Sequence, residues 1–391
     1  MKVALVTTTI HIPRNLESYL ANFARYGHRD VEAIVIGDLK SPPETRNYLE
    51  QLQVQTGYPI SYWDVERQRH WLKDLPRLDA LLPYNSVQRR NLGYLRAAME
   101  GAECIISIDD DNYSTAEDYL SGHTIIGQVM SLPAVASSSG WFNTCRLLKT
   151  SPLKPLYHRG FPTSVRGIPE ELSYSKMKGR IVVNAGLWLD VPDADAMSHL
   201  DCPASVIGFR DGFEGRLAVA RETNLVFNSQ NTAFHRDLLP CMFLIPMGDR
   251  VGDLKVGRYD DIWMSIFIKM IVDHLGDYVC VGIPLTRQKR NDHDLINDLL
   301  EEIPGMRITN TLIRTLARVR LTGGDYYTCY LELVDQLRQA IPEDDFTPAE
   351  RSYLEKMLAR MEAWTGICRE LMEVEKVPAA GPGESPGLHY S

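Results

Sequence analysis

The first part of the chain alternates between short apolar segments and longer segments with helical spacing. The apolar segments are residues 3–8, 31–38, 59–64 and 105–108. The helical segments between them are residues 15–26, 45–52 and 86–101. This alternation predicts a mostly parallel sheet with helices on both faces, in which ligands bind at the carboxyl ends of the strands. We therefore expect an α/β fold.

The pattern changes after this region. Residues 132–220 are rich in Gly, Pro and short apolar runs, with one predicted strand at 180–191. A buried helix is predicted at 261–275, because this segment is apolar on most sides, and a buried strand at 278–285. Residues 325–372 have helical spacing. The expected parts are a domain at 1–300, a C-terminal helical extension at 301–375 and a disordered, Pro/Gly-rich tail at 376–391.

The composition argues against several functional classes. The net charge of −9 argues against binding of a nucleic-acid polymer. No run of 18 apolar residues is present, so we expect no membrane span. The seven cysteines include no CxxC pair, which favours reduced thiols and a cytoplasmic location.

Three consecutive carboxylates, Asp109, Asp110 and Asp111, follow the apolar segment 105–108. Like charges this close repel and raise one another's pKa. A hard divalent cation restores the charge balance, because Mg²⁺ binds one or two carboxylates together with substrate phosphates. The sequence thus predicts a Mn²⁺ or Mg²⁺ site at the end of a strand. The alternative is an acidic turn solvated by water.

Basic residues occur in two further segments that are suited to a phosphate group. Arg90 and Asn91 lie at the start of the helix at 86–101, where backbone N–H groups and guanidinium groups favour phosphate. Arg159 and Arg166 lie in a Gly/Pro loop and are suited to a diphosphate leaving group. The alternative for both segments is a basic, solvated surface.

The segment GRYDDIW precedes the predicted buried helix and contains Arg258, Asp260 and Asp261. One of the two carboxylates is expected to cap the helix, which leaves the other for catalysis. Trp188 and Trp263 are candidates to stack on a sugar, and a packed core position is the alternative for both.

Taken together, several of these segments resemble one family, the reversibly glycosylated polypeptides or UDP-arabinopyranose mutases of glycosyltransferase family 75. The resemblance covers roughly residues 1–300. The matching segments, in the order of the family, are the strand ending at 109–111, RGFP at 159–162, GLWLDVPDADA at 186–196, NTAFHRDL at 231–238 and GRYDDIW with DHLG within 257–276.

The resemblance implies a GT-A-type nucleotide-sugar fold and a metal held by Asp109 and Asp111. The arginine of the family's RG[YF]P motif falls on Arg159. Two features of the family are absent here. Pro152 stands at the place of the self-glycosylated arginine of plant mutases. Arg287 and Gln288 stand at the place of a tryptophan–histidine pair, for which His293 is a candidate substitute.

These observations lead to the hypothesis of a metal-dependent glycosyltransferase that moves a sugar from a nucleotide sugar, most simply UDP-linked, to an acceptor hydroxyl. The expected catalytic residues are Asp260, Asp261 and Arg159. The expected donor-binding residues are Thr7, Thr8, Thr9, Asp38, Arg90, Asn91, Asp109, Asp110, Arg166 and Arg258.

Two alternatives stay open. The first is a UDP-sugar pyranose–furanose mutase, against which the missing arginine counts. The second is a non-catalytic nucleotide-sugar-binding subunit that contacts a partner, or a second copy of the chain, through its C-terminal helices.

Overall fold

The computed structural model describes residues 1–201, 203–213, 215–289 and 294–374. Its α-helices are α1 Asn15–Tyr26, α2 Thr45–Thr56, α3 Val65–Leu72, α4 Pro76–Leu81, α5 Arg90–Met99, α6 Tyr119–His123, α7 Ala196–Asp201, α8 Asp260–Leu275, α9 Leu295–Leu316, α10 Tyr326–Ala340 and α11 Pro348–Val374. Its strands are β1 Val3–Thr9, β2 Val31–Gly37, β3 Ile60–Trp63, β4 Cys104–Ile108, β5 Asn112–Ser114, β6 Val129–Ser137, β7 Leu148–Ser151, β8 Leu172–Asp190, β9 Ser205–Phe209, β10 Arg216–Val219, β11 Asn231–His235, β12 Arg250–Val251, β13 Leu254–Lys255 and β14 Tyr278–Gln288.

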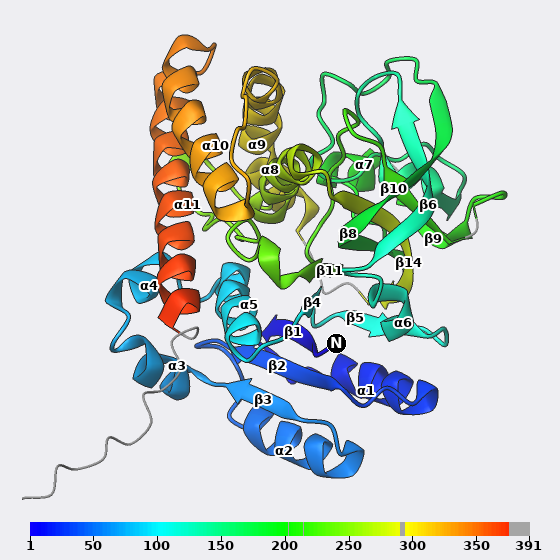
Figure 1. Ribbon diagram of the computed structural model, residues 1–391, viewed down its shortest axis with the longest axis vertical. Coiled ribbons are helices and arrows are strands. Elements are labelled where there is room, and N and C mark those ends of the chain that lie inside the picture. The colour runs from blue at the N-terminus through cyan, green and yellow to red at the C-terminus, as the bar shows by residue number, and fades with distance from the viewer. Residues whose placement is uncertain (202, 214, 290–293, 375–391) are drawn as a thin grey trace, which may run out of the picture.

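A large mixed sheet forms the centre of the fold, in the order β3-β2-β1-β4-β11-β8-β6-β10-β14-β5 (Figure 1). Strands β3, β2, β1 and β4 are parallel to one another. Strand β11 is antiparallel to both β4 and β8, and β8 is parallel to β14. The predicted α/β class, a sheet flanked by helices with a helical C-terminal part, is confirmed. The parallel strands β1 to β4 are those that the alternating N-terminal pattern predicts.

The parallel strands are buried on both faces, which explains why they are apolar almost throughout. In β1, Val3 and Leu5 pack into the core under α1 and α2, whereas Ala4 and Val6 pack into the core on the side of α5. Because successive side chains of a strand point to opposite faces of the sheet, the consecutive apolar residues of β1 are all buried. Helix α5 approaches β1 closely at Gly93, where a Cβ atom would lie only 2.4 Å from Val6 Cγ1.

Helix α9 is the main element that the sequence pattern does not predict, and the boundary expected at residue 300 falls inside it. Pro304 and Gly305, which are poor residues for a helix interior, interrupt its pattern. The glycine is required by packing, because a Cβ at Gly305 would lie 2.3 Å from the Tyr259 ring. The short antiparallel strands of the middle region also carry too little periodicity to predict.

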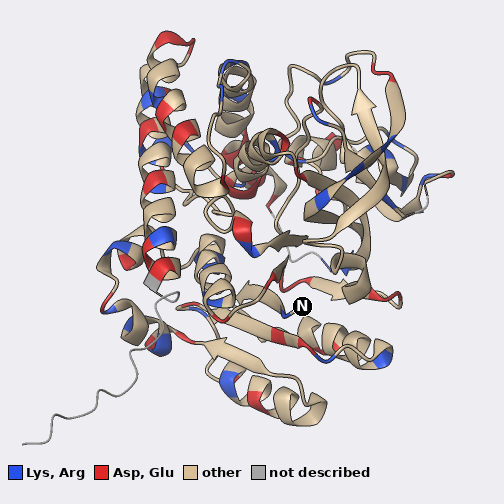
Figure 2. Ribbon diagram, viewed as in Figure 1, with Lys and Arg blue, Asp and Glu red and all other residues tan. Residues whose placement is uncertain are grey.

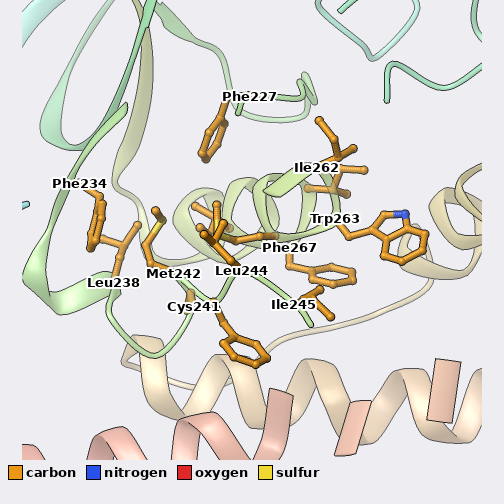
Figure 3. Packing of buried hydrophobic residues seen from close by; sticks show 14 of the residues in the cluster. Phe227, Phe234, Leu238, Cys241, Met242, Leu244, Ile245, Ile262, Trp263 and Phe267 are labelled. Carbon is orange, nitrogen blue, oxygen red and sulfur yellow. The ribbon is translucent and has the colours of Figure 1, made fainter. Parts of the chain in front are cut away.

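Helix α8 is the centre of the larger core (Figure 3). Its side chains, among them Ile262, Trp263 and Phe267, pack against the segment 238–245 and against Phe227. Trp263 is fully buried, and its Nε1 donates a hydrogen bond to Thr309 Oγ1 of α9 at 2.9 Å. The predicted buried helix is therefore confirmed.

The C-terminal helices share this core with the sheet. Trp364 of α11 is fully buried, stacks on Phe243 at a centroid distance of 5.2 Å and donates from Nε1 to the Leu239 carbonyl at 3.1 Å. The apolar stripe of α11 that contains Leu354, Met357 and Met361 is likewise buried within the chain. This stripe is therefore core packing and is not available as a surface for a partner.

Three sequence-based expectations concern residues or features outside this core. The predicted tail at 376–391 and His293 both lie outside the described residues. Among the helices of the described ranges, none combines the length and the apolar character that are needed to cross a bilayer.

Because α11 and the sheet share one core, we expect Trp364→Ala to destabilise the whole protein by about 3–5 kcal/mol. Urea unfolding, followed by both far-UV circular dichroism and tryptophan fluorescence, measures the loss. Glu370→Ala, at an exposed position of the same helix, serves as the control and should change little. A separate early transition that involves only the C-terminal helices would contradict the shared core.

Candidate active site

The carboxyl ends of three neighbouring parallel strands meet at one edge of the sheet. Because β2, β1 and β4 are adjacent in that order, the residues that follow them come together. They line a cavity of about 300 Å³, here called the strand-end cavity. The predicted residues that line it are Thr8, Thr9, Asp38, Arg90, Asp109, Asp110 and Asp111.

A buried arginine neutralises the first carboxylate of the acidic triad. Arg90, only 1% exposed, places Nη2 2.5 Å from Asp109 Oδ1. Its Nη1 donates to Ser107 Oγ and to the Ser229 carbonyl, each at 3.2 Å. Burial alone lowers the pKa of the Arg90 guanidinium, but the attraction of Asp109 outweighs burial and raises it. The positive charge next to the triad is therefore part of the fold.

The other two carboxylates of the triad are less well satisfied. Asp110 lies 2.5 Å from the Thr9 hydroxyl, and burial raises its pKa. The pKa of Asp111 is raised to about 7, first by burial and then by the nearby charges of Asp109 and Asp110. A hydrogen bond from Gln288 acts in the opposite direction. Asp111 Oδ1 is buried and has no hydrogen-bond partner among the described residues.

The residues present are compatible with a divalent cation that is also bound by a ligand. An unpartnered, buried carboxylate oxygen beside a second carboxylate is a suitable start of a Mn²⁺ or Mg²⁺ site. No group of three or more His, Cys, Asp or Glu side chains within the described ranges is arranged to hold a metal alone. Mg²⁺ commonly takes one or two carboxylates plus phosphate oxygens, so Asp111 and Asp109 suffice when a diphosphate completes the shell.

Asp38 lies in the strand-end cavity, but its carboxylate is hydrogen-bonded to backbone N–H groups. It accepts hydrogen bonds from the N–H groups of Leu39, Asn85 and Ser86, at 2.7–3.1 Å. It thereby holds the loop before α5 against the end of β2. Of the predicted threonines, Thr8 and Thr9 line the cavity, whereas Thr7 is fully buried and does not.

Asn91, predicted to bind the donor, lies elsewhere. It is fully buried, and its side chain both donates to the Leu244 carbonyl and accepts from the Leu244 N–H, each at 2.8 Å. This pair of hydrogen bonds attaches α5 to the segment 238–245. The geometry gives Asn91 a structural role.

A second cavity of about 490 Å³ adjoins the first and is here called the α8 cavity. The two cavities share Asp109 and the loop residues 85–87. The polar and charged side chains that line the α8 cavity include those of Gln88, Arg159, Ser229, Lys255, Arg258, Asp260, Asp261 and Glu301. A ligand that occupies both cavities therefore passes directly over Asp109.

Arg159 is bound by two carboxylates at the floor of the α8 cavity. Its Nε and Nη2 donate to the two oxygens of Asp193 at 2.8 and 3.1 Å, and Nη1 and Nη2 donate to those of Asp261 at 3.1 and 3.2 Å. Asp193 also accepts a hydrogen bond from Asn228 at 2.7 Å. Burial alone raises the pKa of Asp193, but the Arg159 charge outweighs burial and lowers it. Arg159 thus keeps Asp193 ionised and holds Asp261 in place through two hydrogen bonds.

Asp260, at the first turn of α8, is the acid that Arg159 does not contact. Its Oδ2 accepts a hydrogen bond from Gln88 Nε2 at 2.7 Å. Burial, and then the negative charge of Asp261, raises the pKa of Asp260 to about 6. No side-chain cap of α8 is formed, so neither carboxylate caps the helix as expected from the sequence. Asp260 is therefore suited to exchange a proton near neutral pH.

The outer wall of the α8 cavity is held by the C-terminal helices. Glu301 of α9 pairs with Lys255 Nζ at 2.9 Å, and its carbonyl accepts from the Gly257 N–H at 3.0 Å. Arg360 of α11 donates to the Pro246 carbonyl at 3.0 Å. The side chain of Arg258, predicted to bind the donor, lies at this wall and donates to Glu302 at 2.7 Å.

The remaining candidates lie outside both cavities. Arg166 pairs with Asp195 and lies over the Tyr157 ring at 5.1 Å. Trp188 is 2% exposed and Trp263 is fully buried, so both are core residues, as the alternative interpretation holds. Pro152, at the place of the family's arginine, lines neither cavity and is exposed.

Three residues of the site are not predicted from the sequence. Gln88 touches Asp260, Ser229 contacts both Arg90 and Asp261, and Lys255 lines the outer wall. Gln88 has a local signal, because it directly precedes the two arginines at the start of the helix. Ser229 and Lys255 have none, because their position depends on segments far apart in sequence.

The model of the family described as "Reversibly glycosylated polypeptide" matches residues 2–371. This match extends past residue 300, where the motif-based resemblance ends, and it includes α9 and α10 and nearly all of α11.

Individual relatives agree with this match. "Probable UDP-arabinopyranose mutase 1" of Pisum sativum is 29% identical over 67% of this chain and 68% of its own length. "Probable UDP-arabinopyranose mutase 2" of Solanum tuberosum is 28% identical over 72% of each chain. "UDP-arabinopyranose mutase 3" of Arabidopsis thaliana is 29% identical over 56% of this chain and 57% of its own length. Among solved structures, GalNAc-T7 with UDP, GalNAc and Mn²⁺ aligns with 97% of this chain and 58% of its own, at 9% identity and a TM-score of 0.41. On the family match, the chain belongs to the reversibly glycosylated polypeptide family.

Proposed function

We propose that this protein is an enzyme that binds a UDP-sugar, breaks its sugar–phosphate bond and transfers the sugar to an acceptor hydroxyl. The observation that carries the proposal is the junction of the two cavities at Asp109. On one side lies an acidic triad beside a buried arginine, and on the other lies Asp260, a buried carboxyl with a pKa of about 6. Family membership supports a UDP-linked donor, because the relatives are named as mutases of a UDP-sugar.

In this proposal the strand-end cavity takes the nucleoside diphosphate. The Thr8 and Thr9 end of β1 and the loop held by Asp38 surround the nucleoside. Asp111 and Asp109 would hold Mn²⁺ or Mg²⁺ on the diphosphate oxygens. The bound cation supplies neutralisation of the negative charge that develops on the leaving diphosphate.

The α8 cavity takes the sugar and the acceptor. The bond between the anomeric carbon and the phosphate oxygen breaks, and its electron pair stays on the UDP oxygen. The acceptor oxygen forms the new bond to the anomeric carbon and gives its proton to the Asp260 carboxylate. Arg159 acts on this step indirectly, since it is hydrogen-bonded to Asp261 and holds it beside Asp260. The Asp261 charge helps to raise the pKa of Asp260, and the Arg159 charge partly offsets this rise. We therefore assign Arg159 to positioning instead of to contact with the diphosphate.

A second candidate is a UDP-sugar mutase, which the names of the relatives favour. In that reaction the sugar returns to UDP after its ring has changed size, and no acceptor is needed. The residue at the place of the family's arginine is Pro152, which cannot hold a glycosyl group on its side chain. A mutase in this chain would need another residue, or water exclusion alone, to keep the sugar in place.

The first test is nucleotide binding by calorimetry, with UDP, GDP, CDP and ADP, in Mn²⁺ and then in EDTA. We expect UDP to bind most tightly, and EDTA to weaken its binding at least tenfold, because the cation screens the triad from the diphosphate. Asp111→Asn should remove this dependence on Mn²⁺, whereas Asp211→Asn, at an exposed acid, should not. UDP binding that is equally tight in EDTA would contradict the metal site.

A second test uses the pH dependence that follows from Asp260. As the base, Asp260 must be ionised, so kcat/KM should fall tenfold per unit below a pH of about 6. Asp260→Asn should lower kcat by about 10²–10⁴-fold and abolish this limb. The titratable groups that interact electrostatically with Asp260 are Asp261, Arg159 and Tyr353.

The same variant should gain stability at neutral pH. The folded-state pKa of Asp260 is raised above its ordinary value of 3.8, so ionisation destabilises the folded state as the pH rises from about 4 to about 6. Asp260→Asn should therefore increase the free energy of unfolding at pH 7 by up to about 3 kcal/mol, which is measured as a higher melting temperature. The increase should be smaller at pH 4. If the variant gained the same stability over the unsubstituted protein at pH 7 and at pH 4, a raised pKa of Asp260 would be contradicted.

The two candidate reactions differ in their products. The protein is incubated with UDP-arabinopyranose and Mn²⁺, without and then with a set of sugar and alcohol acceptors, and the products are separated by anion-exchange chromatography. Free UDP that forms only with an acceptor supports the transferase. UDP-arabinofuranose that forms without an acceptor overturns it in favour of the mutase.

A further inference from the structure

A third cavity lies away from the candidate active site, between the C-terminal half of α8, the end of α9 and the loop around residue 222. Its volume is about 660 Å³, which is in the range of small-molecule sites. Most of its surface is apolar. The apolar side chains that line it are Trp141, Ile266, Met270, Ile313, Leu316 and Val319.

Three arginines surround this apolar cavity. Arg221, Arg314 and Arg320 line it. Within the described ranges none of them forms a direct ion pair, and the nearby acids that they attract are Asp273 for Arg221 and Asp344 for Arg314. Their hydrogen bonds go to the Gly276, Ala317 and Val319 carbonyls and to the Thr311 hydroxyl. Basic residues are visible at the end of α9 in Figure 2. Guanidinium groups that lack an acid partner are available to bind an anion in a fork geometry.

The acids of this cavity do not cancel the three cations. Asp273 is already paired with the buried Lys269, which also donates to the Ala220 carbonyl at 3.2 Å. Glu222 is exposed at the rim, with a positive φ of 67° that turns the loop there. The cavity thus has an apolar interior and a net positive rim.

The cavity is separate from the proposed active site. Asp260 and Asp261 lie in the first turn of α8, whereas Ile266 and Met270 are about 8–15 Å further along the helix axis. The third cavity shares no lining residue with the strand-end cavity or the α8 cavity. A ligand bound there would not occupy the place of the nucleotide sugar.

We propose that this cavity binds an anionic amphiphile, that is, an alkyl chain that carries one phosphate or carboxylate head. The alkyl chain would fill the space between α8 and α9, beside Trp141 and Met270. The head would lie among Arg221, Arg314 and Arg320. A purely polar anion would leave the apolar interior empty, and a neutral alkane derivative would leave the three cations without a partner, so neither matches the cavity as well.

The test is a calorimetric titration of the full chain, without nucleotide, with decyl phosphate below its critical micelle concentration. Decanoate, decyl maltoside and inorganic phosphate are the comparison probes. Decyl phosphate should bind in the micromolar range and change the fluorescence of Trp141, and Trp141→Phe should remove that change. Decyl maltoside should bind at least tenfold more weakly, and inorganic phosphate should give no measurable heat. The ratio between decyl phosphate and decanoate distinguishes a phosphate head from a carboxylate head.

Variants locate the binding. Ala317→Trp, which fills the cavity from the end of α9, should abolish binding, and Arg314→Gln with Arg320→Gln should weaken it at least tenfold. Arg318→Gln is the matched control, because Arg318 lies in the same turn but pairs with Asp344 and does not line the cavity. Asp111→Asn should also bind normally, which separates this proposal from the proposed enzyme activity. Equal affinity for decyl maltoside, or unchanged binding by a folded Ala317→Trp protein, would overturn the proposal.

Discussion

The fold around the candidate site depends on buried arginines that neutralise clustered carboxylates. Arg90 binds Asp109 at the end of β4, and Arg159 binds both Asp193 and Asp261 beneath the start of α8. Each arginine also binds a backbone carbonyl of a different segment, at Ser229 and at Arg258. Unpaired, these acids would repel one another in a medium of low dielectric constant. The arginines therefore connect the parallel sheet, the 158–167 loop and α8 into one arrangement.

Within the described residues this pairing leaves Asp110, Asp111 and Asp260 of the site without an arginine ion pair, and the pKa is raised most in the last two. Asp111 and Asp260 each have a raised pKa, of about 7 and about 6, because burial and neighbouring acids disfavour their ionised forms. Perturbed acids of this kind cluster at functional sites, where a cation or a proton completes the charge balance. Asp111 lies in the strand-end cavity and Asp260 in the adjoining α8 cavity. In the proposed reaction Asp111 therefore binds the cation, and Asp260 accepts the proton.

The C-terminal helices complete the site instead of extending it. Helix α9 holds Lys255 and Gly257 through Glu301, and α11 holds the Pro246 carbonyl through Arg360. These contacts build the outer wall of the α8 cavity from residues more than 40 positions apart. The family match up to residue 371 agrees with a single unit of this extent. The third cavity, between α8 and α9, exists only because these helices pack against the central core.

The parallel half of the sheet and the position of the acidic triad can be predicted from the amino-acid sequence, because strand and helix periodicity are local and the carboxyl ends of parallel strands meet at one edge. The family motifs likewise located Asp260 and Asp261. The folded chain, in contrast, sets the partners of the polar side chains: Asn91 binds the backbone of Leu244, Arg159 binds two acids, and Asp38 accepts hydrogen bonds from backbone N–H groups. Tertiary packing also decides that residues 295–316 form a helix across Pro304 and Gly305. The reason is that these outcomes depend on contacts between distant segments, whose packing energy outweighs local preference and decides which polar groups remain free for a ligand.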